Sequence, residues 1–223
     1  MEAGSLARLA WSDQRSPQLP TRQTVTAVER ELAKQAPTLV PANRVLFWQG
    51  DHQEQDIRII KGVVRAVRLI EDGSRQILTF YWPGDTIAGA SADAQLYTAE
   101  AVTPCRLCWS KPRPGMNVTT GHKQVLQAML PLIVALSKKT TASRIAWFLL
   151  RIRKNLPIDS RRVEAQQLLL SRADIADHLG MSIETVCRTL HDFQSKRLID
   201  LPTRRTIRFR DLAGLTCLSG DAR

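Results

Sequence analysis

Short apolar runs separated by turn residues dominate the first half of the chain, over residues 39–109. The run at 57–69 is rich in β-branched residues and is interrupted by Lys61-Gly62, and Asp72-Gly73 separates it from another run at 76–82. An Asp-Gly pair between two apolar runs is a strong signal for a hairpin turn. Regular spacing of this kind predicts short antiparallel strands that form a small β-roll of the jelly-roll type.

The periodicity changes to that of a helix after Pro114-Gly115. Large aliphatic residues then recur at helical spacing, which indicates one apolar stripe along a long helix, although Pro131 within it can introduce a kink. The stripe can pack on the roll, or it can form the seam of a dimer because it stands between two predicted domains. The residues assigned to the dimer seam are Leu126, Met129, Leu130, Ile133 and Leu136.

A further helix is predicted at 141–153, and residues 171–196 then have the pattern of two short helices joined by a tight turn. Ser171 and Asp174 fit a capping box at the start of the first helix, and Gly180 allows the positive φ that ends it. Ser182 caps the second helix. The apolar side chains expected to face the first helix are Ile183, Val186, Leu190 and Phe193.

The spacing of a helix-turn-helix is present at Ala176, Gly180 and Val186. The small Ala176 permits close approach of the two helices, Gly180 makes the turn, and Val186 fills the core between them. An αα-hairpin that binds nothing has a similar outline. The exposed face of the second helix therefore decides the interpretation. It carries Glu184 and Arg188, which lie one helical turn apart and can read a G·C pair together, with Arg188 on guanine and Glu184 on the cytosine amino group. The alternative for these two residues is a weak surface ion pair.

Residues 198–201 and 206–209 read as a β-hairpin wing around a basic tip at 202–205, so the domain is predicted to be a winged helix-turn-helix. Contacts to the phosphate backbone fix position without specifying sequence. The residues assigned to the DNA backbone or its neighbourhood are Ser171, Arg172, Ser182, Thr185, Arg204 and Arg205.

The distribution of charge indicates that the second half of the 223-residue chain has an anionic partner. The net charge is +11, of which +8 falls from Lys138 onward and +3 on the residues before it. No apolar run is long enough to span a membrane, the mean hydropathy is −0.19, and no secretory signal is recognised at the N-terminus. We therefore expect a cytoplasmic protein without a membrane partner.

These patterns predict an α+β fold and divide the chain into four parts. The parts are a loosely ordered lead-in at 1–30, an antiparallel β-roll at 31–114, a dimerisation helix at 115–137 and a winged-helix DNA-binding domain at 138–223. Cys105 and Cys108 form a C-x-x-C pair within a predicted strand. The flanks supply no further ligands for a zinc site, so two strand cysteines are the favoured interpretation.

The run from Leu170 to Leu190 resembles the signature of the CRP/FNR superfamily, and is most similar to its FixK-type branch. The resemblance extends over residues 38–215 and includes Gly73-Ser-Arg-Gln-Ile-Leu and Pro83-Gly84-Asp85 in the roll. It implies a β-roll sensor, a long dimerisation helix and a C-terminal winged helix. It further implies a homodimer that binds double-stranded DNA at a TTGA-N-TCAA-type operator, contacts RNA polymerase and usually activates transcription. The base-reading Glu and Arg of the family fall on Glu184 and Arg188.

The predicted sensor departs from family members with known effectors. Residues 84–99 contain no Arg to meet a cyclic-nucleotide phosphate, and Asp93 among them would repel it. No Cys precedes Cys105, which excludes an N-terminal four-thiolate iron–sulfur cluster. A metal-dependent cupin-like enzyme would need clustered His and carboxylate ligands on strands, which the pattern lacks. We therefore expect no catalytic residues, no metal and no cofactor, while an unidentified small effector stays an open alternative.

Cys187 lies on the predicted reading helix between Glu184 and Arg188. A helix N-terminus and a neighbouring Arg both favour thiolate and raise reactivity. One hypothesis is that oxidation to sulfenic or sulfinic acid adds bulk and charge at the DNA surface and weakens binding. The alternative is that a small side chain fits the groove there and any redox effect is incidental.

Overall fold

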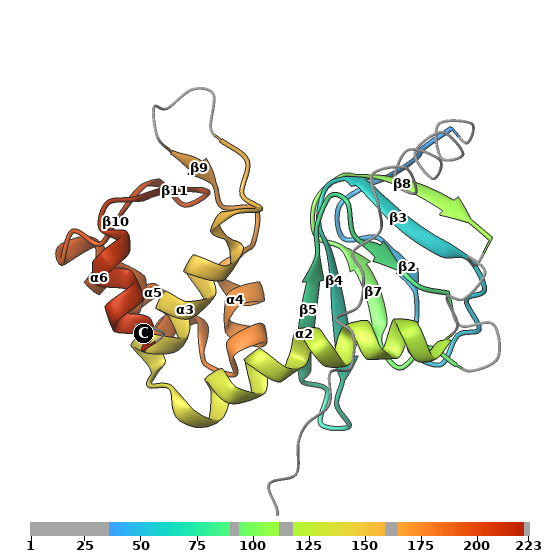
Figure 1. Ribbon diagram of the computed structural model, residues 1–223, viewed down its shortest axis with the longest axis horizontal. Coiled ribbons are helices and arrows are strands. Elements are labelled where there is room, and N and C mark those ends of the chain that lie inside the picture. The colour runs from blue at the N-terminus through green and yellow to red at the C-terminus, as the bar shows by residue number, and fades with distance from the viewer. Residues whose placement is uncertain (1–35, 90–93, 112–117, 159–164, 221–223) are drawn as a thin grey trace, which may run out of the picture. The chain divides into compact units, whose positions relative to one another are not determined.

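The computed structural model describes residues 36–89, 94–111, 118–158 and 165–220 (Figure 1). The predicted lead-in at 1–30 and Asp93 lie outside these ranges. The described residues from Pro37 onward belong to one compact unit.

The N-terminal part is an antiparallel β-roll, as the alternation of apolar runs and turns predicts. Two four-stranded sheets form it, in the orders β1-β8-β3-β6 and β2-β7-β4-β5. The strands are β1 (Thr38–Val40), β2 (Val45–Phe47), β3 (Asp56–Lys61), β4 (Val64–Leu69), β5 (Arg75–Tyr81), β6 (Thr86–Ile87), β7 (Thr98–Ala101) and β8 (Cys105–Ser110). The Asp72-Gly73 turn joins β4 to β5, and Gly73 adopts a positive φ of 82°.

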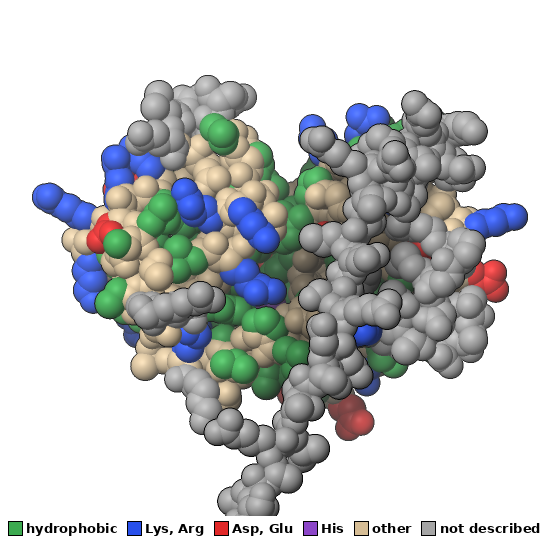
Figure 2. Space-filling model, in the orientation of Figure 1, with side chains coloured by type: hydrophobic (Ala, Val, Ile, Leu, Met, Phe, Trp, Pro, Cys, Tyr) green, Lys and Arg blue, Asp and Glu red, His purple; other side chains and the backbone are tan. Residues whose placement is uncertain are grey.

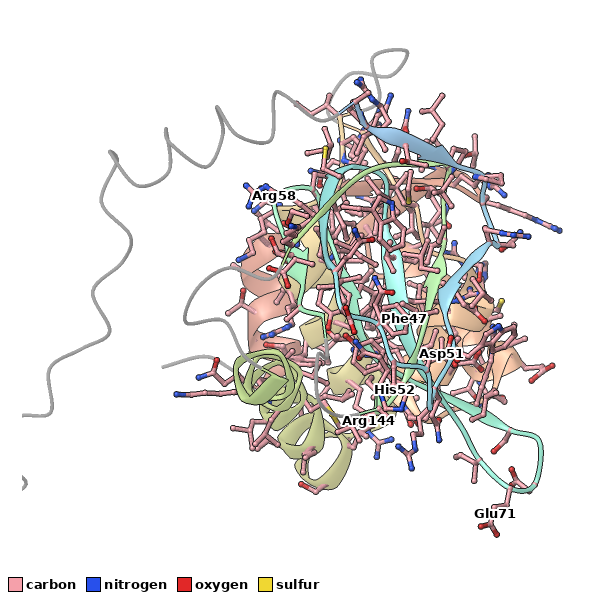
Figure 3. All side chains as sticks on the ribbon, turned by 90° about the vertical axis from the view of Figure 1, so that its right-hand side faces the viewer. Phe47, Asp51, His52, Arg58, Glu71 and Arg144 are labelled. Carbon is pink, nitrogen blue, oxygen red and sulfur yellow. The ribbon has the colours of Figure 1, made fainter. Side chains whose placement is uncertain are left out.

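Side chains from both sheets meet in a closed apolar core inside the roll. Ile57, Ile59 and Leu107 are fully buried there, and Phe47 points in among the strands while Glu71 projects from the β4–β5 turn (Figure 3). Cys105 and Cys108 on β8 are both buried. Within the described ranges, no three His, Cys, Asp or Glu side chains lie close enough together to hold a metal ion.

Strand β5 has a buried residue on each of its faces near its end. Successive side chains of a strand point to opposite faces, so Tyr81 joins the core of the roll while Phe80 and Trp82 join a second core. This second core also contains the C-terminal helices. The sheet that holds β4 and β5 is therefore covered on both sides.

Helix α2 (Val118–Lys138) is continuous through Pro131. One side of it packs on the protein, with Val125, Leu132 and Ala135 buried. Met129 and Leu136, both assigned to the dimer seam, are partly buried against the two cores. The remaining seam residues are half exposed: Leu126 at 55%, Leu130 at 53% and Ile133 at 49%.

The C-terminal part is a winged helix-turn-helix, as predicted. It contains α3 (Thr141–Arg153), α4 (Arg172–Leu179), α5 (Ile183–Ser195), β10 (Ile199–Thr203) and β11 (Thr206–Phe209). The sequence did not predict β9 (Gln166–Gln167), which pairs with β11, or α6 (Leu212–Ser219), which packs on α3. Among the described helices, none is both long and apolar enough to cross a membrane.

Candidate nucleic-acid interface

The first helix of the motif, α4, begins at a complete capping box. The Ser171 hydroxyl accepts a hydrogen bond from the Asp174 backbone N–H at 3.0 Å, and the Asp174 carboxylate accepts one from the Ser171 N–H at 2.9 Å. These bonds satisfy amides that a helix start otherwise leaves free. Gly180 ends α4 with φ 58° and ψ 53°, in the left-handed region where glycine carries little strain.

Helix α5 is capped by Ser182, whose hydroxyl accepts a hydrogen bond from the Thr185 N–H at 3.2 Å. Val186, Leu190 and Phe193 are buried and fix the helix in the domain. Ile183 was expected to join them, but this is wrong, because its side chain is 45% exposed. It is the first residue of α5, where a side chain has helix neighbours on one side only.

The outer face of α5 presents Glu184, Cys187 and Arg188 to solvent, with Thr185 half buried beside them. Hydrogen bonds from its own backbone N–H and from the Ser182 hydroxyl lower the pKa of Glu184, so this carboxylate is ionised at neutral pH. Within the part of the chain that the structure describes, Arg188 forms no ion pair with Glu184 or another carboxylate. Both side chains are exposed, so both can meet an external partner.

Arg172 lies in a less open position than a simple phosphate contact requires. Its guanidinium is partly buried, and one nitrogen, Nη1, is inaccessible to solvent and has no hydrogen-bond partner among the described residues. Burial lowers the pKa of Arg172, and the sulfur of neighbouring Cys187 opposes part of that effect. One guanidinium nitrogen of Arg172 is thus unsatisfied in the neighbourhood of the exposed thiol.

The wing brings two further cations to the surface. Arg204 and Arg205 are exposed at the tip between β10 and β11. The Thr203 N–H donates to the Thr206 hydroxyl at 2.9 Å, and the Arg205 N–H donates to the Thr203 hydroxyl at 3.2 Å, which holds the tip in a tight turn. On the face shown in Figure 2, Lys and Arg side chains gather over the C-terminal elements.

Contacts between the roll and α4 were not predicted from the sequence. Arg65 of β4 binds two carboxylates, that of Asp174 in the capping box and that of Glu100, the latter at 2.7 Å. Burial would lower the pKa of Arg65, but the two carboxylates outweigh it and raise the pKa. Arg75 of β5 adds a 2.6 Å ion pair to Asp177.

His178 of α4 is buried between two rings. Its ring centre lies 5.3 Å from that of Phe80 and 5.1 Å from that of Phe148. Its Nδ1 lies 3.0 Å from the Ile77 carbonyl oxygen, which can only accept, so Nδ1 carries the proton. Burial lowers the pKa of His178 to about 4 despite this bond, which keeps the ring neutral.

Comparison with known proteins gives consistent matches along the chain. Residues 143–218 match the model of the Crp-like helix-turn-helix domain, and residues 37–111 match that of the cyclic nucleotide-binding domain. The nitrogen fixation regulation protein FixK of Azorhizobium caulinodans is 32% identical over 191 residues, covering 80% of this chain and 77% of FixK. The transcriptional activator protein FnrA of Stutzerimonas stutzeri is 26% identical over 198 residues, covering 79% of this chain and 78% of FnrA.

A solved structure is similar over most of the chain as well. FixK2 from Bradyrhizobium japonicum superposes with a TM-score of 0.74 at 26% identity, covering 85% of this chain and 99% of FixK2.

Proposed function

Because this chain belongs to the CRP/FNR family of DNA-binding transcription regulators, we propose that it binds a palindromic TTGA-N-TCAA-type operator as a homodimer. There it activates transcription through contact with RNA polymerase, in the cytoplasm where the DNA lies. The observation that carries the proposal is the outer face of α5, where an ionised Glu184 and an ion-pair-free Arg188 stand side by side.

The chemistry of these two side chains fits the G·C pair of the TTGA half-site. An Arg guanidinium can donate two hydrogen bonds to guanine O6 and N7, and a carboxylate can accept from the cytosine amino group. A carboxylate near phosphates costs free energy unless it has such a donor. Glu184 is therefore better explained by a base contact than by a contact to the DNA backbone.

Hydroxyls and cations around α5 suit the phosphates on either side. Ser171, Ser182 and Thr185 lie at the starts of α4 and α5, where free amides and the positive end of the helix favour anions. Arg204 and Arg205 at the wing tip are placed to reach a second stretch of backbone. Contacts of this kind set position and salt dependence, and leave sequence choice to Glu184 and Arg188.

A dimer supplies the two-fold symmetry that a palindromic operator needs. Leu126, Leu130 and Ile133 form an exposed aliphatic stripe on α2, and Val134 beside them is 56% exposed. A second copy of the same helix can cover this stripe across a two-fold axis. Leu130→Glu is expected to shift the protein to monomer in sedimentation experiments.

Binding measurements with matched variants test base recognition. Sequences selected from a random DNA pool should contain the G·C pair, and Arg188→Gln should lose about 1–3 kcal/mol of discrimination at that pair. Arg204→Gln should instead weaken binding to all sequences and reduce the salt slope by about one. A selected half-site without a G·C pair, or an Arg188→Gln protein that keeps its preference, would refute the assignment.

Cys187 adds a redox control to this proposal. Hydrogen peroxide would oxidise it in balanced steps: the thiolate sulfur attacks one peroxide oxygen, the O–O bond breaks, and water leaves after proton transfer, giving the sulfenate. A second peroxide gives the sulfinate. The Arg172 guanidinium, whose Nη1 has no partner among the described residues, offers this new anion a cation, and the added charge lies beside Glu184 and Arg188 on the surface proposed to contact the bases.

Operator binding before and after peroxide separates this control from an incidental effect. The parent protein should lose affinity on oxidation, while Cys187→Ser should bind before treatment and keep its affinity afterwards. If the Ser variant loses binding as readily as the parent, the thiol is not the switch and its small size alone explains its position. Purified protein that binds the operator without added ligand speaks against an obligatory small effector, which is the second candidate for control.

A further inference from the structure

Helix α4 is held on the roll by two ion pairs along one of its faces. Asp174 and Asp177 lie three positions apart, so their side chains share a face of the helix. Arg65 of β4 binds the Asp174 carboxylate, and Arg75 of β5 binds that of Asp177 at 2.6 Å. Strands β4 and β5 are neighbours in one sheet. The helix is therefore tied to two adjacent strands.

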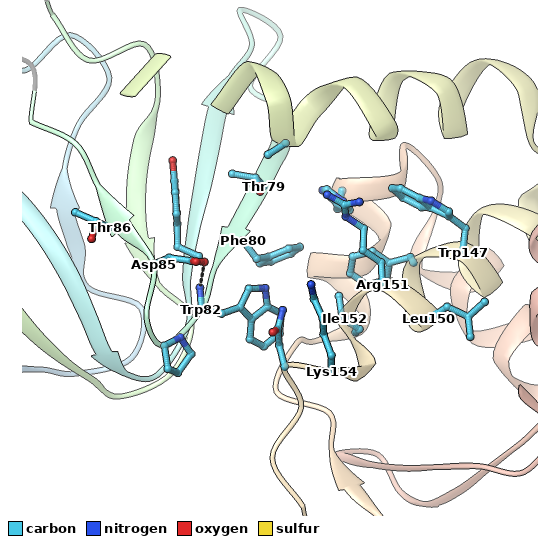
Figure 4. Close-up of a pocket in the computed structure, with 16 residues that line it drawn as sticks. Thr79, Phe80, Trp82, Asp85, Thr86, Trp147, Leu150, Arg151, Ile152 and Lys154 are labelled. Atoms are coloured by element: carbon cyan, nitrogen blue, oxygen red, sulfur yellow. Dashed lines mark hydrogen bonds between the residues drawn. The ribbon is translucent and has the colours of Figure 1, made fainter. Parts of the chain in front are cut away.

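These ion pairs are directional, unlike the apolar packing beside them. Phe80 and Trp82 near the end of β5 point toward α3 (Figure 4), in a core that the C-terminal helices share. Apolar burial is non-directional, whereas a planar guanidinium binds carboxylates in a fixed fork geometry. The Arg65 guanidinium is itself fixed on the roll, because its Nε and Nη2 each lie 2.7 Å from one Glu100 carboxylate oxygen. Its Nη1 therefore meets Asp174 from a set direction.

The junction between α2 and the C-terminal helices is short. Lys139 and Thr140 alone separate the end of α2 from the start of α3. A few residues at the ends of helices are enough to act as a hinge between two parts of a protein. The ion pairs of α4 bridge this junction from the side of the roll, and α5 follows α4 directly after the turn at Gly180. They are thus placed to set the direction of both helices.

We propose that Arg65 and Arg75 are positioning residues for operator binding, which hold α4 and α5 at the angle to α2 that lets both protomers of a dimer reach their half-sites together. The inference rests on the proposed dimer, whose seam lies on α2. Once one protomer is bound, contact with the second half-site is intramolecular, and its gain in affinity depends on geometry. Arg65 is buried, so its effect on DNA binding passes through α4.

Duplexes with two half-sites and with one test this role. Fluorescence anisotropy gives the Kd of the full-length protein for a palindromic TTGA-N-TCAA duplex and for the same duplex with one half-site scrambled. The parent should bind the palindrome at least about tenfold more tightly, because the second contact is intramolecular. Arg65→Met and Arg75→Met should each reduce this ratio at least about threefold and leave the Kd for the single half-site within about twofold of the parent.

The ratio separates positioning from a loss of folding, which would weaken both complexes in parallel. The Arg75 pair is partly exposed, at 35% for Arg75 and 26% for Asp177. Arg75→Met therefore keeps the test decisive if loss of the buried pair impairs folding. Arg65→Lys, which keeps the charge, should retain part of the ratio that Arg65→Met loses.

Arg68→Met is the matched control, since it removes the same charge from β4 but its guanidinium donates to the Leu96 carbonyl oxygen within the roll. It should keep the ratio of the parent. A parent ratio near one would overturn the proposed dimeric binding and the positioning with it. A parent ratio that persists in both Arg65→Met and Arg75→Met would overturn the positioning alone, as would an equal loss in Arg68→Met.

Discussion

Replacing His178 removes a buried imidazole whose protonation opposes folding. The ring lies between Phe80 and Phe148, and its Nδ1–H donates to the Ile77 carbonyl. Burial lowers its pKa from 6.5 to about 4, so the unfolded chain takes up a proton in a pH range where the folded chain does not. Stability is therefore present above about pH 6.5 and falls as the pH drops toward 4.

The size of the effect follows from the difference between the two pKa values. One pKa unit corresponds to about 1.4 kcal/mol, so the full window from 6.5 to about 4 is worth roughly 3 kcal/mol. At about pH 5 the folded protein should have lost about 2 kcal/mol of its unfolding free energy through this group alone. His178→Asn keeps an N–H donor near the Nδ1 position but cannot titrate, so this part of the pH dependence should disappear.

Urea unfolding followed by circular dichroism, at one protein concentration and at pH values between about 7.5 and 4.5, measures this difference. The informative quantity is the change in unfolding free energy with pH, not the absolute stability of the variant. His191→Gln, an exposed histidine on α5, is the matched control and should keep the slope of the parent. If His178→Asn and the parent lose the same free energy down to pH 5, the histidine is not buried in the neutral form and the geometry around it is wrong.

Substitutions at three further positions test the contacts that support α4. Arg65→Met leaves the Asp174 carboxylate, 3% exposed, without its cation, and should lower the unfolding free energy in urea titrations by about 3–5 kcal/mol; a loss below 1 kcal/mol would contradict a buried pair. Ser171→Ala removes the cap and should cost about 1 kcal/mol, seen as a lower Tm, whereas Ser171→Asp should retain most of the stability. Gly180→Ala places a side chain at φ 58° and should cost about 1 kcal/mol in the same assay, and an unchanged Tm would show that the turn tolerates it.

Features set by neighbours in sequence could be predicted, and those set by distant partners could not. The capping box at Ser171, the turn at Gly180 and the bounds of α3 each depend on residues a few positions apart. Helix α6 is short and β9 has only two residues, so neither has a hydrophobic period long enough to detect. The apolar spacing of α5 predicted which of its side chains are buried, except for Ile183. This residue is exposed because it lies at the end of the helix, although it fits the helical period.

Arg65 shows why the contact between the roll and α4 was missed. Arg65 alternates with apolar residues in the run Val64–Leu69, a pattern typical of a strand face that meets solvent. The residue that neutralises its charge, Asp174, lies 109 positions away, so the sequence around Arg65 gives no sign of the ion pair. The same alternation places Phe80 and Trp82 on that face, and it gives the sheet two apolar sides. A charged residue within a strand therefore indicates a second buried face only when large apolar residues occur on both faces of the same sheet.

The Asp174 carboxylate has two structural roles, one in the cap of α4 and one in the contact between α4 and the roll. One oxygen accepts from the Ser171 N–H and completes the cap of α4, and the other accepts from Arg65 of the roll. Separating the roll from α4 would expose a cap residue and break this ion pair, whose carboxylate is 3% exposed, so β4 and α4 are joined by a specific contact. The position of β4 is therefore linked directly to the capping box with which the helix-turn-helix begins.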